Sequence, residues 1–375
     1  MKTTEKDKKP LIIVTAGGSG GHVYPAESLA EELLKRGYEV ELVTDSRGKD
    51  NYKGSLAKIP NHAVLAGALV GKSKLFKLQS LAKTCIGIVQ SALLLLKRKP
   101  VCVVGFGGYA SFPCAMAAIL LGNDLVLHEQ NSVMSRTNRF LSKYAALIAQ
   151  SFRKVKYTPQ DIKTVLTGMP VRQSIVALHE RKLPPVDAEH KFQILVMGGS
   201  QGAKVFGDVL PAAIARFSAD QRKQIKIFQQ CRADDVEAVK EAYKGLETEV
   251  ILSPFFENMP EIYNGSHVII SRAGASSICE IAIVGLPSVL VPLPIAADDH
   301  QTSNAREIED ARAGIVIRQS DFTAVKLHQV LENLLQDREL LQLMSDSAKK
   351  IAVLNAAERF ADAIEKEIIT KKSGK

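Results

Sequence analysis

Short apolar runs rich in Val and Ile alternate with longer helical patterns along most of the 375-residue chain. Strands that are apolar on both faces are typical of parallel sheets covered by helices on each side. The alternation therefore predicts an α/β fold. The expected strands lie at 11–16, 39–44, 101–105, 124–127 and 146–149, and then at 192–197, 225–228, 249–252, 268–270 and 288–291.

Two glycine-rich segments divide the chain into similar halves. LIIVTAGGSGGH at 11–22 and FQILVMGGSQGA at 192–203 each place glycines after a buried strand and before a helix. The length suits about two domains, so this weak repeat predicts two doubly wound domains rather than one long sheet. We expect the first domain at 8–168 and the second at 169–345, with a C-terminal helix at 346–370 that crosses back to the first.

Composition excludes several classes of protein. Hydrophobic residues make up 46% of the chain and charged residues 24%, which excludes disordered and fibrous proteins. The five cysteines form no CxxC pair, so the sequence predicts neither a zinc site nor a disulfide framework. The amino terminus is polar, and the longest unbroken apolar run is far shorter than the ~18 residues of a membrane span. We therefore expect a cytoplasmic protein.

The first glycine loop, Gly17 to Gly21, leads into a helix that begins near His22. Its backbone N–H groups favour a phosphate or pyrophosphate, and the alternative is a tight turn that needs glycine only for positive φ. The loop matches neither the Walker motif nor the GxGxxG dinucleotide motif. A helix N-terminus lowers the pKa of a histidine and favours the neutral ring that a general base requires. A hydrogen-bonding residue at the helix start is the alternative interpretation of His22.

Two loops in the second half suit a nucleoside diphosphate. GGSQGA at 198–203 and SRAGASS at 271–277 each follow an apolar strand. Glu280 lies in the second turn of the helix after the later loop, where a carboxylate can accept both hydroxyls of a ribose. The alternative is a solvent-facing helix residue. The triplet at 298–300 (DDH) has no distant partner at metal-ligand spacing, so we expect no metal there.

Taken together, these motifs resemble those of the MurG-type N-acetylglucosaminyltransferases of peptidoglycan synthesis. The motifs are GGSGGHVYPA (17–26), GFGGYASFP (105–113), LHEQNSVMSRTNRFLS (127–142), GMPVR (168–172), GGSQGA (198–203), SRAGASSICEIAIVGLPSVLVP (271–292) and AADDHQTSNA (296–305). They follow the family order across essentially the whole chain. The resemblance implies two Rossmann-like domains facing a cleft, which is the GT-B glycosyltransferase architecture.

The resemblance also implies an activity, the inverting transfer of N-acetylglucosamine from UDP-N-acetylglucosamine to lipid I. The acceptor is the C4 hydroxyl of the N-acetylmuramyl-pentapeptide on undecaprenyl pyrophosphate, and the product is lipid II. Helix N-termini and an arginine can stabilise the leaving diphosphate, so no obligatory metal or other cofactor is expected. His22 is the expected general base, with Glu129 as the alternative.

Individual binding residues follow by motif match. They are Ser19, Gly20, Gly21, Asn131, Arg172, Ser200, Phe256, Ala275, Ser276, Ser277, Ile278, Cys279, Glu280 and Gln301. Asn131 would contact the N-acetylglucosamine, the backbone at Phe256 the uracil, and Gln301 the sugar hydroxyls. Met169 stands where the family motif GNPVR has Asn, which puts one hydrogen bond at that turn in question.

The segment from 70 to 100 carries seven Lys and Arg and no acid. Its apolar residues recur at helical spacing and predict a stripe that faces the core; they are Leu75, Leu78, Ala82, Cys85, Ile86, Val89, Leu93 and Leu96. Phe76 and Leu94 fall on the opposite side. We expect a patch that docks on anionic lipids at the cytoplasmic face of the inner membrane, made of Lys72, Lys74, Phe76 and Lys77.

Other functions remain open at this level. The nearest is another UDP-sugar glycosyltransferase of the same architecture or a UDP-sugar epimerase, which would share the nucleotide half. A different class is a non-catalytic membrane or nucleic-acid binding protein that uses the net charge of +9. The expected partners are UDP-N-acetylglucosamine, lipid I, anionic lipids and the cell-wall synthesis machinery, with no nucleic acid.

Overall fold

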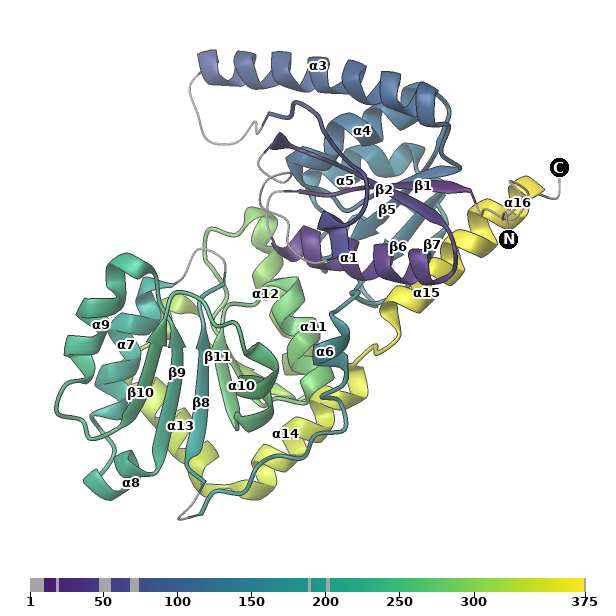
Figure 1. Ribbon diagram of the computed structural model, residues 1–375. Coiled ribbons are helices and arrows are strands. Elements are labelled where there is room, and N and C mark those ends of the chain that lie inside the picture. Colours follow the sequence, from purple (N-terminus) through teal and green to yellow (C-terminus); the bar gives the residue numbers. More distant parts are fainter. Residues whose placement is uncertain are drawn as a thin grey trace. The chain divides into compact units, whose positions relative to one another are not determined.

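The computed structural model describes residues 10–17, 20–46, 55–67, 74–187, 190–199 and 203–373. The chain divides into two compact units, Met1–Arg172 with Asn355–Lys375, and Gln173–Leu354. Each unit contains one parallel sheet with helices on both of its faces (Figure 1). The expected α/β class, with two domains of this kind, is confirmed.

The sheet of the first unit has the strand order β3-β2-β1-β4-β5-β6-β7. Its strands are β1 (Leu11–Thr15), β2 (Glu39–Thr44), β3 (Asn61–Ala63), β4 (Cys102–Gly105), β5 (Asp124–Glu129), β6 (Leu147–Gln150) and β7 (Thr164–Leu166). The helices are α1 (Gly20–Lys35), α3 (Lys74–Arg98), α4 (Gly108–Leu120), α5 (Arg136–Leu141), α15 (Ala356–Ile364) and α16 (Thr370–Ser373). Because β1 and β4 are buried along their whole length, the centre of this sheet lies in the core.

The sheet of the second unit has the order β10-β9-β8-β11-β12-β13. Its strands are β8 (Phe192–Met197), β9 (Ile225–Gln230), β10 (Glu249–Ser253), β11 (Val268–Ser271), β12 (Ser288–Leu290) and β13 (Gly314–Val316). The helices are α6 (Gln173–Val176), α7 (Lys204–Ile214), α8 (Ala219–Lys223), α9 (Val236–Tyr243), α10 (Met259–Gly265), α11 (Ala275–Val284), α12 (His300–Asp310), α13 (Ala324–Gln336) and α14 (Arg338–Ile351). Both sheets thus share one parallel, doubly wound plan.

The strands predicted from the sequence are all present, but three short strands were missed. These are β3, β7 and β13, which lie at sheet edges and have three residues each. Their residues are half-buried or exposed, so they lack the continuous apolar run that marks a central strand. Edge strands of this length leave little periodicity to detect.

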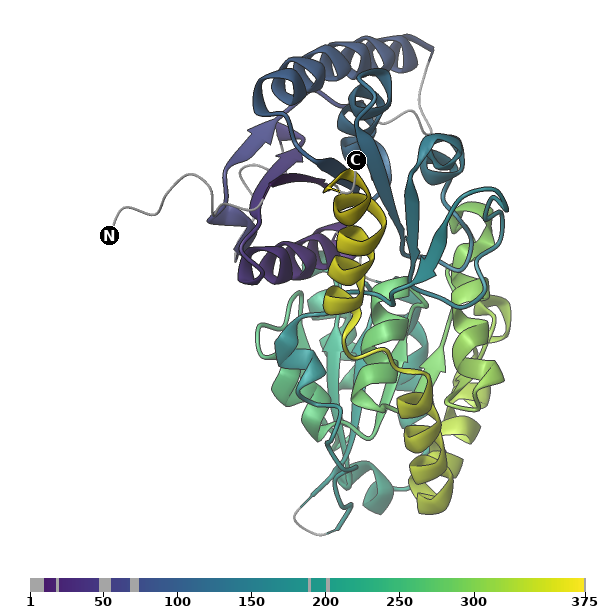
Figure 2. The same cartoon turned by 90° about the vertical axis from the view of Figure 1, so that its right-hand side faces the viewer.

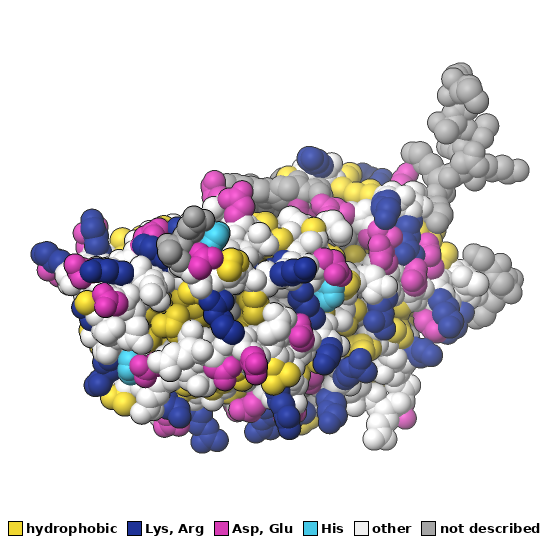
Figure 3. All heavy atoms as spheres, turned by 90° about the horizontal axis from the view of Figure 1, so that it is seen from below, with side chains coloured by type: hydrophobic (Ala, Val, Ile, Leu, Met, Phe, Trp, Pro, Cys, Tyr) yellow, Lys and Arg dark blue, Asp and Glu magenta, His cyan; other side chains and the backbone are white. Residues whose placement is uncertain are grey.

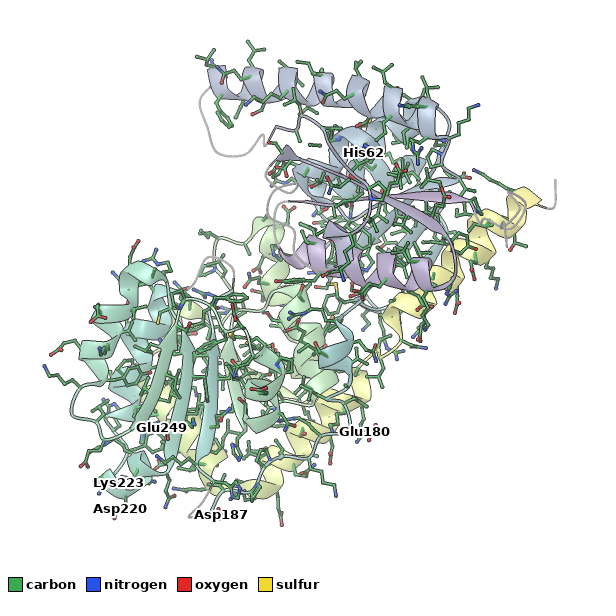
Figure 4. The ribbon with its side chains drawn as sticks, in the orientation of Figure 1. His62, Glu180, Asp187, Asp220, Lys223 and Glu249 are labelled. Carbon is green, nitrogen blue, oxygen red and sulfur yellow. The ribbon has the colours of Figure 1, made fainter. Side chains whose placement is uncertain are left out.

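Ion pairs join the amino ends of β8, β9 and β10 in the second unit. Glu249 begins β10 and pairs with Lys226 at 2.8 Å and with Lys191 at 3.1 Å (Figure 4). These pairs lower the pKa of Glu249. Over the face shown in Figure 3, basic and acidic side chains are likewise interspersed. No large field of one sign arises from such a mixture.

The C-terminal segment returns to the first unit as predicted, but the single helix expected at 346–370 is wrong, because the helix is broken between Ile351 and Ala356. α14 packs on α11 in the second unit, whereas α15 packs on α1 in the first (Figures 1 and 2). Phe360 and Ile364 of α15 are fully buried in the core beneath α1. Two amphipathic helices with different partners therefore replace one long helix, with Ala352 extended between them (φ −65°, ψ 145°).

Helix α3 covers α4 in the first unit (Figure 2). The face of α3 that is buried is the opposite of the one that we predicted. The expected core stripe is exposed: Leu75 is 67% exposed, and Leu78, Ile86, Val89, Leu93 and Leu96 are at least half exposed. The buried residues are Ser80, Thr84, Gly87, Ser91 and Leu95. Leu94, expected on the far side, packs against the core, and Phe76 is half-buried. The prediction of which face is buried was therefore wrong.

Close backbone packing explains this inversion. A Cβ on Gly87 would lie 1.8 Å from the carbonyl oxygen of Leu65, and a Cβ on Gly67 would lie 2.3 Å from that of Ser80. The segment near Leu65 thus runs directly beneath the small residues of α3, and larger side chains would not fit. Among the described residues α3 is also the one helix long and apolar enough to cross a membrane by length and composition, a test that core helices also pass.

Candidate functional site

Residues of the quoted motifs lie at the carboxyl ends of the strands in both units. In the first unit these are the loops after β1 and β4 and the segment after β5. In the second unit they are the loops after β8 and β11. Open α/β sheets bind ligands at this edge. Each unit thus carries its own candidate half-site.

His22 lies in the first turn of α1 and is oriented by the loop after β4. Its Nδ1 donates to the carbonyl oxygen of Phe106 at 2.8 Å. Burial lowers the pKa of His22, although the bond to Phe106 opposes that shift. Nε2 lies beside Gly108, where a Cβ would come within 3.5 Å of it and within 3.6 Å of the carbonyl oxygen of Gly17. The lone pair of the neutral ring therefore lies between two glycine loops.

These loops require glycine. A Cβ on Gly17 would lie 2.6 Å from Cβ of Ala110, and Gly107 and Gly108 have positive φ values of 78° and 76°. Next to them, the Tyr109 hydroxyl donates to Oδ2 of Asp45 at 2.6 Å. The described residues that follow β1, β2 and β4, namely Gly17, Asp45 and Tyr109–Ala110, thus pack against one another. The sequence analysis missed the Tyr109–Asp45 pair, because nothing in the spacing joins residues 64 positions apart.

Glu129 ends β5 and is fully buried. Its Oε1 accepts from the backbone N–H of Asn131 at 2.9 Å. Its Oε2 accepts from the N–H of Ser135 at 3.0 Å and from Nδ2 of Asn138 at 2.8 Å. Burial raises the pKa of Glu129, and these donors oppose the shift. Both oxygens therefore serve to order the loop that carries Asn131.

Other predicted residues of the first unit are placed as follows. Gly20 and Gly21 open α1, and the guanidinium of Arg172 lies 4.7 Å above the ring centre of Tyr24. Nε of Arg172 is buried and has no hydrogen-bond partner in the described part of the chain. A buried donor of this kind is available to bind an anion. The predicted residues Ser19, Ser200 and Lys72 lie outside the described residues.

Helix α11 carries the predicted diphosphate and ribose residues of the second unit. It begins at Ala275 after an extended Gly274 and ends at Val284, where the positive φ of 67° at the capping Gly285 terminates it. Ala275 and Ile278 are buried, while Ser276, Ser277, Cys279 and Glu280 are half-buried. Glu280 Oε2 accepts from the Tyr263 hydroxyl at 2.8 Å. The alternative of a solvent-facing Glu280 does not match this burial.

Gln301 joins two loops at the same edge. Its Oε1 accepts from the backbone N–H of Ala273 at 3.2 Å and of Leu293 at 2.9 Å. Asn304 donates to the carbonyl oxygen of Ala273 at 3.1 Å. Arg272 donates to the carbonyl oxygen of Val291 at 3.0 Å. Arg272 and Asn304 lie within the quoted motifs, but their supporting role could not be read from residue order.

The predicted residue Phe256 and the motif departure Met169 both have buried side chains. Phe256 packs edge-on against Phe228, with ring centres 5.9 Å apart, so its side chain belongs to the core. Met169 is buried and lies against Ser151, whose hydroxyl is 3.9 Å from its sulfur. The described residues contain no group of three or more His, Cys, Asp or Glu arranged to hold a metal ion.

Comparison with known proteins gives matches along most of the chain. The glycosyltransferase family 28 N-terminal domain matches residues 12–150, and the glycosyltransferase family 28 C-terminal domain matches residues 193–366. A protein of Paramagnetospirillum magneticum is 42% identical over 95% of this chain and 96% of its own length. A protein of Gluconobacter oxydans is 40% identical over 94% and 98%. Both are named UDP-N-acetylglucosamine–N-acetylmuramyl-(pentapeptide) pyrophosphoryl-undecaprenol N-acetylglucosamine transferase.

Solved structures give a similar result. The crystal structure of Acinetobacter baumannii MurG superposes with a TM-score of 0.75 and 30% identity, covering 96% of this chain and 100% of that one. The UDP-GlcNAc 2-epimerase of Neisseria meningitidis superposes with a TM-score of 0.67 at 15% identity, covering 95% and 100%. At that identity the second likeness concerns the fold alone.

Proposed function

Because the chain belongs to glycosyltransferase family 28, among its MurG-type members, we propose that it makes lipid II. It transfers N-acetylglucosamine from UDP-N-acetylglucosamine to the C4 hydroxyl of the N-acetylmuramyl-pentapeptide of undecaprenyl-pyrophosphate-linked lipid I. The observation that carries this proposal is the 42% identity to a transferase of that name over nearly the full chain.

The second unit binds the donor. The N-terminus of α11 directs backbone N–H groups to the diphosphate, and Glu280 accepts the ribose hydroxyls. Gln301, whose carbonyl oxygen is occupied by two backbone donors, keeps its amide nitrogen for the hydroxyls of the sugar. The backbone near Phe256 meets the uracil, since the phenyl ring itself is buried. The two loops and Glu280 together suit a UDP-sugar.

The first unit binds the acceptor and supplies the base. Nε2 of His22 accepts the proton of the attacking hydroxyl, because Nδ1 is held by Phe106. Glu129 is a positioning residue that orders the loop of Asn131, since both its oxygens are engaged. As the C4 oxygen attacks the anomeric carbon, the bond to the diphosphate breaks and the configuration inverts. The helix N-terminus and Arg172 stabilise the charge that develops on the leaving group, without an obligatory metal.

The exposed face of α3 docks on the cytoplasmic leaflet of the inner membrane. Leu75, Leu78, Val89 and Leu93 form an apolar face that nothing in the described chain covers. Lys74, Lys77 and Lys83 are exposed on the same helix, and no acid lies within it. The face of α3 that carries its small residues packs on the rest of the first unit. A helix lying in the membrane surface therefore fits better than a helix that crosses the membrane. The predicted patch of Lys72, Lys74, Phe76 and Lys77 is thereby extended to the face first assigned to the core.

A transfer assay tests the reaction. The purified chain is given UDP-N-acetylglucosamine with a radiolabelled sugar and a short-chain lipid I analogue, and the disaccharide lipid is separated by chromatography. We expect labelled lipid II analogue and the release of one UDP for each sugar transferred. Conversion of the donor into an epimeric UDP-sugar without the acceptor, or UDP binding with no transfer, would overturn the proposal.

A further inference from the structure

Helices α10 and α11 hold a buried tyrosine against the carboxylate that we assign to the ribose. Tyr263 is 2% exposed, and its hydroxyl donates to Oε2 of Glu280 at 2.8 Å. A buried tyrosine hydroxyl needs a hydrogen-bond partner, and this one takes a side chain at the edge of the candidate site. The bond therefore connects the core of the second unit to the nucleotide edge.

Arg181 fixes the two helices that make this contact. Its guanidinium donates to the carbonyl oxygens of Tyr263 and Asn264 at the end of α10, and to that of Val284 at the end of α11. Burial lowers the pKa of Arg181 to about 10, so it stays charged near neutral pH. One cation thus binds the C-termini of both helices, where the negative ends of their dipoles lie. Tyr263 and Glu280 therefore lie on two helices that the same side chain joins.

The chemistry of the diol explains why the frame matters. A ribose offers two neighbouring hydroxyl donors, and an ionised carboxylate has two acceptor oxygens and no proton of its own, so it can accept both. A phenol that donates to one carboxylate oxygen restricts the orientation of the carboxylate plane. Loss of that donor removes one of the contacts that orient the Glu280 carboxylate toward the two hydroxyls.

We propose that Tyr263 is a positioning residue that holds Glu280 for the ribose diol and so sets the preference for ribonucleotide over 2′-deoxyribonucleotide donors. This inference rests on the proposed role of Glu280. It adds a specificity device that neither residue order nor the motifs indicate, since Tyr263 lies outside every quoted motif.

The variant Tyr263→Phe tests the inference, because it keeps the ring and removes only the hydroxyl. Calorimetry measures the Kd of UDP and of 2′-deoxy-UDP for the full chain. We expect UDP to bind about two- to tenfold more weakly and 2′-deoxy-UDP to change less, so that the ratio of the two Kd values moves toward one. A purely structural role would weaken both nucleotides equally, and that result would overturn the inference.

Tyr243→Phe is the matched control. Tyr243 is 7% exposed in the same unit, and its hydroxyl donates to Oε1 of Gln229 at 2.7 Å, away from α11. It loses a buried tyrosine hydroxyl just as Tyr263→Phe does. We expect the ratio of the two Kd values to stay at the parent value.

Glu280→Gln separates this inference from the function on which it rests. If the parent ratio survives in Glu280→Gln, the ribose role of Glu280 fails. If Glu280→Gln abolishes the preference while Tyr263→Phe retains it, only the inference about Tyr263 fails. In the double variant we expect no loss beyond that of Glu280→Gln, because Tyr263 acts through that carboxylate. Circular dichroism on each variant confirms that binding is measured on folded protein.

Discussion

His22 donates from Nδ1 to the carbonyl oxygen of Phe106 at a distance of 2.8 Å. A carbonyl can only accept, so Nδ1 carries the proton and Nε2 of the neutral ring carries the lone pair. The same carbonyl accepts from Nε2 of Gln130 at 2.6 Å. The backbone after β4 therefore sets both the tautomer and the direction of the one nitrogen that can take a proton.

Replacing His22 by Ala should lower kcat by about 10²–10⁴-fold and leave the Kd of UDP near the parent value, because a positioned base acts on the chemical step. Steady-state kinetics with a lipid I analogue and calorimetry with UDP measure the two quantities. His62→Ala is the control, since His62 lies on β3 and pairs with Glu41 (Figure 4). Near-normal turnover in His22→Ala would return His22 to a purely structural role.

The value of kcat should fall only on the acid side of its pH profile, below pH 6.5. A base works when deprotonated, and burial lowers the pKa of His22 from its usual 6.5, so the neutral ring persists to lower pH. Turnover measured from about pH 5 to pH 8 gives the midpoint of the acid limb. A midpoint above 6.5 would contradict the assignment.

Glu129→Gln should destabilise the first unit and disturb acceptor use without removing the acid limb. The new amide nitrogen would face a donor, either the N–H of Asn131 or those of Ser135 and Asn138. The unsatisfied pair should cost about 1–3 kcal/mol in the free energy of unfolding. Denaturant unfolding and the kcat profile measure the two effects, with the exposed Glu339→Gln as control. If the acid limb vanished with stability unchanged, Glu129 and not His22 would be the base.

Changing Leu78, Val89 and Leu93 together to Ser should abolish binding to vesicles of anionic lipid at both low and high salt. These side chains supply exposed apolar area, which salt does not screen. Changing Lys74 and Lys77 to Ser should weaken binding mainly at low salt, by about 1 kcal/mol for each charge. Co-sedimentation measures both, and Val325→Ser on α13 is the control for an exposed apolar residue in the other unit. Equal sedimentation of all variants would leave α3 without a membrane role.

Gly87→Ala should displace α3 from the segment near Leu65 on which it packs, or unfold the helix locally. The added Cβ would lie 1.8 Å from the carbonyl oxygen of Leu65, and backbone cannot move aside as a flexible side chain can. Hydrogen exchange of α3 amides should rise, and vesicle binding should fall with it. Ala82→Ser, on the exposed face of the same helix, should change neither. Unchanged exchange in Gly87→Ala would mean that the close approach is relieved elsewhere.

Central strands and motif positions could be predicted from the sequence, but the direction of α3 could not. Periodicity shows that Leu75 and Leu93 share a face, yet it is silent on whether that face meets the core or a membrane. The answer lies in Gly87 and Ser91, whose small size lets backbone approach, and such residues carry no hydropathy signal. The break before α15 was missed for a similar reason. α14 and α15 pack on different helices, but no Pro or Gly between them marks the change in the sequence.

Within the candidate site, the sequence motifs contain the residues that we propose to meet ligands, but they do not reveal the residues that hold those side chains in place. His22 and Glu280 stand in motifs, and each lies at the carboxyl edge of its sheet. Their supports, Phe106 and Tyr263, lie 84 and 17 positions away and act through one carbonyl and one hydroxyl. Contacts of this kind depend on how loops meet in space. Glu129 shows the converse, since its place in a motif did not reveal that both its oxygens are occupied.

The return of the chain into the first unit has a consequence for its synthesis. Phe360 and Ile364 complete the core beneath α1, but they follow the whole of Gln173–Leu354 in the chain. A ribosome releases residues in order, and domains fold as units once their residues are free. The second unit can therefore close while the first still lacks α15. The domain that is begun first is the one finished last.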